Sequence, residues 1–193
     1  MAEGVVARPW TVLTSKITYA DRWLRIRTDD VRTGRGDVIA DFHILEYPDW
    51  INVIAVQDDG QLLLAREYRH GVGQVVLGLI SGGVEIVDGD LGLDGLEASA
   101  RRELYEETGF VVETLTPVLT CYANSASHNN LVTTFIARGL EKVAEPNFEV
   151  GEEVELVAMD PNELFKALGE GSIIMQAVHL AGLYAAWHAK LIG

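Results

Sequence analysis

Three carboxylates spaced for one face of a helix constrain this chain more than any other feature. The run that begins at Arg102 reads RELYEETGF, and in a helix Glu103, Glu106 and Glu107 lie at positions i, i+3 and i+4. Like charges so close repel one another, and the C-terminal end of a helix disfavours anions further, by about 1 kcal/mol in total. A hard divalent cation such as Mg²⁺ prefers carboxylate oxygens and relieves this repulsion. The spacing therefore predicts a metal-binding helix.

The alternative interpretation is a solvated acidic helix face, which an isolated cluster of this spacing more often is. Three neighbouring features favour the metal site. Arg102 can orient a carboxylate through a forked hydrogen bond, Gly109 follows the helix as a C-terminal cap, and a glycine-rich acidic stretch over residues 71–95 leads into it. Together these features indicate a functional site.

Hydrophobic periodicity predicts a mixture of short strands and helices. The acidic helix is predicted over Leu96–Thr108, a second helix begins at Asp160 with a proline at its first position, and a third spans Ser172–Leu191. The turn DDG at residues 58–60 predicts a hairpin. Strands are predicted from short apolar runs at 16–19, 23–28, 38–47, 51–56, 62–66, 111–119, 131–138 and 154–159. The pattern indicates an α/β (α+β) fold.

Charge restricts the partners of this chain. Its 193 residues carry 15 Lys and Arg against 29 Asp and Glu, a formal net charge of −14. Nucleic acids and anionic membranes bind basic surfaces, so neither is expected as a partner. No apolar run reaches the roughly 18 residues that span a bilayer. The single cysteine, Cys121, excludes an internal disulfide and a cysteine-rich zinc site, and we expect a cytoplasmic protein.

A change in charge marks a boundary after residue 47. Residues 1–47 hold seven basic and seven acidic side chains, so all the net negative charge lies in residues 48–193. Three short antiparallel strands are predicted in the first segment, and a sheet of this size is marginal alone. We therefore expect residues 1–47 to pack on the main domain, residues 48–193, or on a second copy of the chain in a homodimer.

The motif and its surroundings resemble the Nudix hydrolase family. The family's box reads glycine, five residues, glutamate, seven residues and then REUxEExGU, where U is apolar, and its second half matches from Arg102 onward. Asp94 fills the first acidic position. The glycine corresponds to the run GGVE at Gly82–Glu85, so a five-residue expansion lies between Ile86 and Leu93. The resemblance implies a Nudix-type α/β/α sandwich with a mixed sheet, preceded by a small N-terminal antiparallel β segment.

From about Trp10 to Trp187 the chain is similar to the ADP-ribose pyrophosphatase-like branch of that family. This similarity implies that Arg66 and Arg69 contact phosphate or ribose, which suits the bidentate chemistry of guanidinium. The alternative is that one of these arginines pairs with Glu67 or Asp59 on the surface, and for Arg66 both interpretations stay open. The glutamate and proline that the branch carries before its double glycine are replaced within Gly78–Ser81. The moiety linked to the nucleoside diphosphate, ADP-ribose or a nucleotide sugar, therefore stays open.

A loop acid acts as general base in this branch, and the run GEEVE at residues 151–155 occupies the same place. Glu152 is the first candidate and Glu153 the second; the alternative is a solvent-facing turn. His128, in a polar loop, is a weaker candidate for the base. His179 falls in a helical pattern, and we expect a structural role for it.

Together these features predict a divalent-metal-dependent pyrophosphohydrolase. The three helix glutamates would bind Mg²⁺ or Mn²⁺, a backbone carbonyl near Gly82 or Gly83 is a further candidate ligand, and Glu106 and Arg102 also serve catalysis. The substrate would be a nucleoside diphosphate linked to another moiety, and the products a nucleoside monophosphate and a phosphorylated moiety. The alternative is an inactive nucleotide-binding sensor or scaffold with the same fold.

Overall fold

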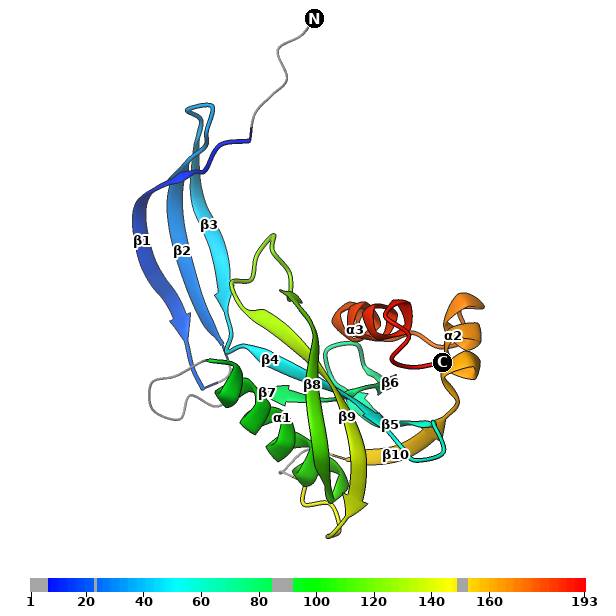
Figure 1. The fold of residues 1–193 in the computed structure, drawn as a ribbon. Coiled ribbons are helices and arrows are strands. Elements are labelled where there is room, and N and C mark those ends of the chain that lie inside the picture. Colours follow the sequence, from blue (N-terminus) through cyan, green and yellow to red (C-terminus); the bar gives the residue numbers. More distant parts are fainter. Residues whose placement is uncertain (1–6, 23, 85–91, 149–152) are drawn as a thin grey trace, which may run out of the picture. The chain divides into compact units, whose positions relative to one another are not determined.

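The chain divides into two compact units in the computed structural model (Figure 1). The residues that the structure describes are 7–22, 24–84, 92–148 and 153–193. One unit comprises Met1–Tyr47 and Tyr122–Asn130, and the other comprises Pro48–Cys121 and Leu131–Gly193. The second unit carries the acidic helix and is where the candidate site is built.

The first unit is a three-stranded antiparallel sheet. Its strands are β1 (Thr11–Ala20), β2 (Arg25–Arg32) and β3 (Val38–Glu46), in the order β1-β2-β3. All residues of β1 are exposed. The buried side chains of β2 are Thr28, Asp29 and Val31, of which only the last is apolar. The hydrophobic effect therefore contributes little to this unit from its own strands.

A distant segment completes the first unit. Leu45 pairs with His128 in a parallel bridge, and the Leu45 N–H donates to the carbonyl oxygen of Ser127 at 2.8 Å. The rings of Tyr47 and His128 lie 5.2 Å apart, centre to centre. His128, the weaker candidate for the base, therefore belongs to the β1-β2-β3 unit.

The second unit is built on a mixed sheet of seven strands. The path β10-β5-β4-β9-β8 forms its body, with β6 paired to β5 and β7 paired to β4. The strands are β4 (Trp50–Val56), β5 (Leu62–Arg69), β6 (Gln74–Gly78), β7 (Ile80–Gly83), β8 (Phe110–Tyr122), β9 (Leu131–Lys142) and β10 (Val154–Met159). Strands β4 and β9 run parallel, whereas β4 is antiparallel to β5 and β7. The predicted hairpin at residues 58–60 is confirmed between β4 and β5.

In the part of the chain that the structure describes, three helices accompany this sheet: α1 (Leu93–Thr108), α2 (Pro161–Gly169) and α3 (Ala177–His188). Asp160 caps α2 as predicted, because its side chain accepts from the N–H groups of Asn162 and Glu163. The predicted start of the last helix at Ser172 is wrong. The Ser172 N–H donates instead to the carbonyl of Ala167, which keeps the chain wrapped around the end of α2. No helix in the described ranges is long and apolar enough to cross a membrane.

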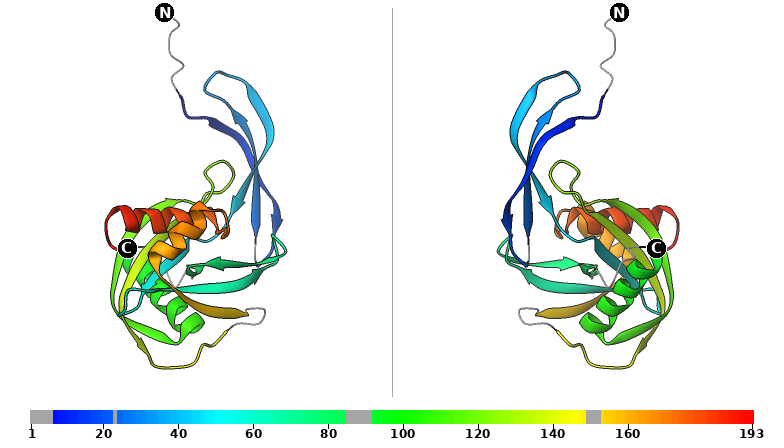
Figure 2. Two further views of the ribbon diagram at one scale, coloured as in Figure 1. Left: turned by 90° about the vertical axis from the view of Figure 1, so that its right-hand side faces the viewer. Right: turned by 90° about the vertical axis from the view of Figure 1, so that its left-hand side faces the viewer.

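Alternate residues of the central strand β4 belong to two hydrophobic cores on opposite faces of the sheet. Ile51, Val53 and Ala55 pack in the core that contains α1, whereas Ile54 and Val56 pack in the core that contains α2 and α3. This alternation follows from the two-residue period of a strand. Figures 1 and 2 show α1 on one side of the sheet and α3 on the other. The predicted α/β/α sandwich with a mixed sheet is confirmed.

Candidate metal and substrate site

Helix α1 holds its carboxylates at different depths. Ala100 and Leu104 are 0% exposed and lie in the core beside the central strands. Glu107 is three residues from Leu104, shares its face and is 9% exposed. The side chains of Glu103 and Glu106 are 13% and 36% exposed. The apolar face of the helix is turned toward the core, so Glu107 is the most buried of the three acids and Glu106 the most exposed.

The end of α1 requires glycine. Gly109 has φ of 73°, in the left-handed region, and its N–H donates to the carbonyl of Tyr105 at 2.7 Å. A Cβ at this position would overlap the carbonyl oxygen of Ala144. The N–H groups of Val143 and Ala144 in turn donate to the Gly109 carbonyl. The segment after β9 is thereby held against the last turn of the acidic helix.

Strand β7 makes room for the first helix acid. A Cβ at Gly82 would overlap the carboxyl group of Glu103, so only glycine lets that side chain lie flat against the strand. This approach brings the first glutamate of the motif to Gly82 and Gly83, the positions predicted to offer a backbone ligand. The spacing within α1 could not show it, because the contact joins residues twenty-one apart in the chain.

Arg102 joins the components of the site. Its Nη1 donates to Glu106 Oε2 at 2.6 Å, and its Nη2 donates to Glu103 Oε1 at 2.7 Å and to the Gly83 carbonyl at 3.2 Å. Burial lowers the pKa of Arg102, but the charges of Glu103 and Glu106 raise it by more, so the pKa lies above its ordinary value. The guanidinium therefore stays charged and orients two of the three acids.

The donor set fits a hard divalent cation by its chemistry. Three carboxylates and the neighbouring β7 carbonyls supply oxygen ligands, which Mg²⁺ and Mn²⁺ prefer. Within the residues that the structure describes, however, no three His, Cys, Asp or Glu side chains gather as a group that could hold a metal ion. The Arg102 ion pairs supply the positive charge between Glu103 and Glu106 in this arrangement.

The loop candidates for the general base lie before β10. Glu153 is exposed and directly precedes that strand, whereas Glu152 lies outside the described residues. Most of the predicted expansion between Ile86 and Leu93 also lies outside them, and Asp94 is in the first turn of α1. The Asn147 N–H donates to the backbone carbonyl of Glu106 at 2.8 Å, so the segment after β9 contacts α1.

Both arginines of β5 form ion pairs. Arg66 Nη1 lies 2.9 Å from Glu155 Oε2, and Arg69 pairs with Glu67. The first pair arises because Arg66 and Glu155 are directly opposite in the antiparallel pairing of β5 and β10. A sequence pattern could not show this partner, which is eighty-nine positions away. Arg66 therefore forms a surface ion pair, but with Glu155 and not with Glu67 or Asp59, whereas Arg69 has the expected partner Glu67.

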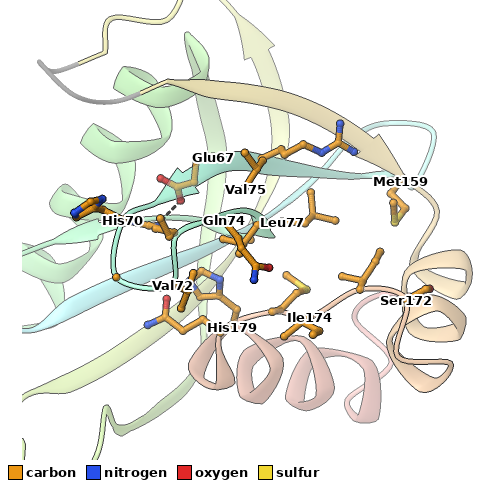
Figure 3. A pocket seen from close by; sticks show the side chains of 18 residues that line it. Glu67, His70, Val72, Gln74, Val75, Leu77, Met159, Ser172, Ile174 and His179 are labelled. Atoms are coloured by element: carbon orange, nitrogen blue, oxygen red, sulfur yellow. Dashed lines mark ion pairs between the residues drawn. The ribbon is translucent and has the colours of Figure 1, made fainter.

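Both arginines also line a pocket of about 810 Å³ that sequence reasoning missed (Figure 3). Its walls come from β5, β6 and the segment that leads into α3, and they include His179. The Leu79 N–H donates to His179 Nδ1 at 3.3 Å, and burial together with the charge of Arg69 lowers the pKa of this histidine to about 4. Hydrophobic periodicity places His179 on α3, but no pattern in the sequence signals a pocket.

Two family models match the chain. The model described as "NUDIX domain" matches residues 47–177. The model described as "Nucleoside diphosphate sugar hydrolase N-terminal domain" matches residues 10–45. The first match covers α1 with its acids and the β5 arginines, and the second covers the strands of the exposed three-stranded sheet.

Relatives and a solved structure agree with these models. An "ADP-ribose pyrophosphatase" of Bacillus subtilis (strain 168) is 24% identical over 74% of this chain and 72% of its own length. Another of that name from Mycobacterium tuberculosis is 23% identical over 94% and 84%, and a "Methanol dehydrogenase activator" of Bacillus methanolicus is 23% identical over 84% of each. The solved structure "Crystal structure of ADP compounds hydrolase" superposes with a TM-score of 0.80 and 18% identity, covering 96% of both chains.

Proposed function

The chain belongs to the NUDIX domain family, a family of hydrolases, and on that premise we propose that it hydrolyses ADP-ribose or a nucleoside diphosphate sugar with Mg²⁺ or Mn²⁺. The observation that carries this proposal is the contact network of α1, in which Arg102 binds Glu103, Glu106 and the Gly83 carbonyl. The match of residues 10–45 to the sugar hydrolase N-terminal domain and the two pyrophosphatase relatives support the substrate class.

Each group of the site has a part in the proposed reaction. Glu103, Glu106 and Glu107 would hold the cation, which when bound polarises the diphosphate and lowers the pKa of water. Arg102 keeps two of these carboxylates oriented through its forked hydrogen bonds. Glu153, or Glu152 beside it, would accept the proton of the attacking water.

Substrate positioning falls to the arginines of β5. Arg66 and Arg69 have side chains that are 43% and 45% exposed, so both can reach a diphosphate in solution. A guanidinium carries five N–H donors, and an ion pair with one carboxylate leaves several of them for phosphate oxygens. The products would be a nucleoside monophosphate and the phosphorylated second moiety.

The test is hydrolysis of ADP-ribose and of a panel of nucleotide sugars with Mg²⁺, comparing wild type with Glu106→Gln and Glu107→Gln. We expect each substitution to lower kcat by about 100-fold or more, since removal of one electrostatic stabiliser of a transition state costs that much. Glu141→Gln is the matched control, because Glu141 is an exposed acid at the end of β9, outside the site. Unchanged turnover in both site variants would contradict the mechanism.

Complete absence of turnover in wild type, with nucleotide binding retained, would favour the sensor or scaffold instead.

We further propose a homodimer formed through the exposed three-stranded sheet. Its support is a set of exposed apolar side chains in and beside β1: Trp10, Val12, Ile17 and Tyr19 are 50%, 55%, 43% and 50% exposed. Apolar surface gathered in this way is typical of a site of protein association.

A further inference from the structure

The pocket of about 810 Å³ lies in the second unit, on the side of the sheet that α3 covers. It opens between the β5-β6 hairpin and the residues that connect α2 to α3 (Figure 3). Its volume is within the range of small-molecule sites, roughly 300–1,000 Å³. None of the three helix acids, and neither Gly82 nor Gly83, is among its lining residues. The pocket is therefore distinct from the proposed metal site.

The walls are rich in apolar side chains, among them Val72, Val75, Leu77, Met159, Ile173 and Ile174. Three of them are well exposed, with Val72 at 63%, Val75 at 61% and Ile174 at 80%. A flat apolar ligand that covers these side chains removes apolar area from water. This burial favours binding by about 25 cal/mol per Å². The apolar walls of the pocket therefore suit a ligand with a flat ring.

His179 supplies a directional group in this apolar setting. It is 3% exposed, and within the described part of the chain its ring makes one hydrogen bond, in which Nδ1 accepts the Leu79 N–H. An imidazole whose Nδ1 accepts carries its proton on Nε2. The ring lines the pocket, and its lowered pKa keeps it neutral near pH 7. It therefore offers a fixed N–H donor to a ligand acceptor.

Gly78 makes the approach of that ring possible. A Cβ at Gly78 would lie 3.0 Å from both Cε1 and Nδ1 of His179, closer than an ordinary contact. The histidine thus fills the space in which a side chain at position 78 would project. A longer residue there would push the ring aside and break its hydrogen bond with the Leu79 N–H.

The rim of the pocket is polar and cationic. Arg66 and Arg69 line it together with the amide side chains of Gln74 and Gln176. The two arginines are each bound to one carboxylate, and they retain further donors for an anion. An amide offers both a donor and an acceptor, which matches the mixed edge of a heterocyclic base.

We propose that this pocket binds a nucleoside monophosphate. The base packs against the apolar walls and accepts the Nε2–H of His179, and the phosphate meets Arg66 and Arg69 at the rim. The choice of a monophosphate as ligand rests on the proposed function, because it is one product of that reaction. Arg66 and Arg69 also position the substrate diphosphate in the proposed function, so a monophosphate bound here would compete with the substrate for these two arginines.

Titration calorimetry with AMP in EDTA tests the proposal, since EDTA removes any binding that depends on a metal at α1. We expect wild type to bind one AMP and Ile174→Trp, which fills the pocket from an exposed position, to bind about tenfold more weakly or not at all. Val111→Trp is the matched control, because Val111 is 40% exposed on β8 and does not line the pocket. We expect it to bind as wild type does.

A second measurement places the ligand at the histidine. In ¹⁵N spectra of histidine-labelled protein, AMP should shift the His179 Nε2 resonance, and Arg66→Ala should weaken AMP but leave adenosine unchanged. Absence of AMP binding in EDTA, or equal affinity in wild type and Ile174→Trp, would overturn the proposal. Hydrolysis of ADP-ribose by the same wild-type preparation is measured separately, with Mg²⁺ and without EDTA, so a failure of the pocket and a failure of the proposed function are distinguishable.

Discussion

At the scale of single residues, Gly82 determines where the first acid of α1 can lie. In Gly82→Ala the new methyl group overlaps the Glu103 carboxyl, so the side chain must leave its place beside Arg102. A misplacement of about 1 Å can cost about 100-fold in rate, and we expect kcat to fall by about that factor. Steady-state hydrolysis of ADP-ribose with Mg²⁺ measures it.

Gly169→Ala is the control for that substitution, because a Cβ at Gly169 in α2 meets nothing within 4 Å. We expect its activity to match wild type and its stability to rise slightly, as alanine is the better helix former. If both alanine variants retained full activity, the position of Glu103 against β7 would have no catalytic role.

His179 makes stability depend on pH. Burial, and then the charge of Arg69, lowers its pKa from 6.5 to about 4, so the unfolded chain takes up a proton at a higher pH than the folded one. The contribution of the neutral ring is complete above pH 6.5 and declines as the pH falls toward 4, by about 3 kcal/mol. Urea unfolding of wild type and His179→Asn between pH 4 and 7 measures it. The variant should show a shallower fall, and parallel curves would contradict the assignment.

At the scale of elements, the end of α1 couples the helix to the segment after β9. In Gly109→Ala the residue keeps an unfavourable positive φ and meets the Ala144 carbonyl, so we expect a loss of at least about 2 kcal/mol of unfolding free energy. Gly60→Ala is matched in backbone conformation, with φ of 85°, but its Cβ meets nothing within 4 Å. It should cost only about 1 kcal/mol. Equal losses in chemical denaturation would show that the Ala144 contact contributes nothing.

The elements differ in how far sequence reasoning could define them. The end of α1 was predictable, because its apolar residues and acids repeat at helical spacing up to Thr108 and Gly109 caps it. Its predicted start is Leu96, but the helix begins three residues earlier, at Leu93. The start of α3 was not predictable, since the apolar spacing continues back through Ile174 while the backbone there wraps around the end of α2. Periodicity reports which side chains can be buried, and it does not report which hydrogen bonds the backbone makes.

At the scale of the whole molecule, the proposed homodimer accounts for the exposed apolar side chains of the three-stranded sheet. We expect light scattering at micromolar concentration to give twice the chain mass of 21.1 kDa. The double variant Val12→Lys and Ile17→Lys should be monomeric, because the interface would bury the added ammonium groups without a carboxylate partner. Val143→Lys, 52% exposed in the second unit, is the control and should remain a dimer. A monomeric wild type would contradict this proposal.

The sequence by itself determined which helix residues make up the proposed site. The spacing of Glu103, Glu106 and Glu107, the adjacent Arg102 and the terminal Gly109 follow from local helix geometry, and the residues that form them are consecutive. The α/β class followed in the same way, because strand and helix periods differ.

Only the tertiary structure decided which groups meet across the chain. It brings Gly82 against Glu103, sets Arg66 opposite Glu155, and builds a pocket around His179 from segments a hundred residues apart. These contacts depend on strand pairing and on how the sheet faces pack. Many registers and packings are compatible with one pattern of apolar residues, so local spacing cannot select among them.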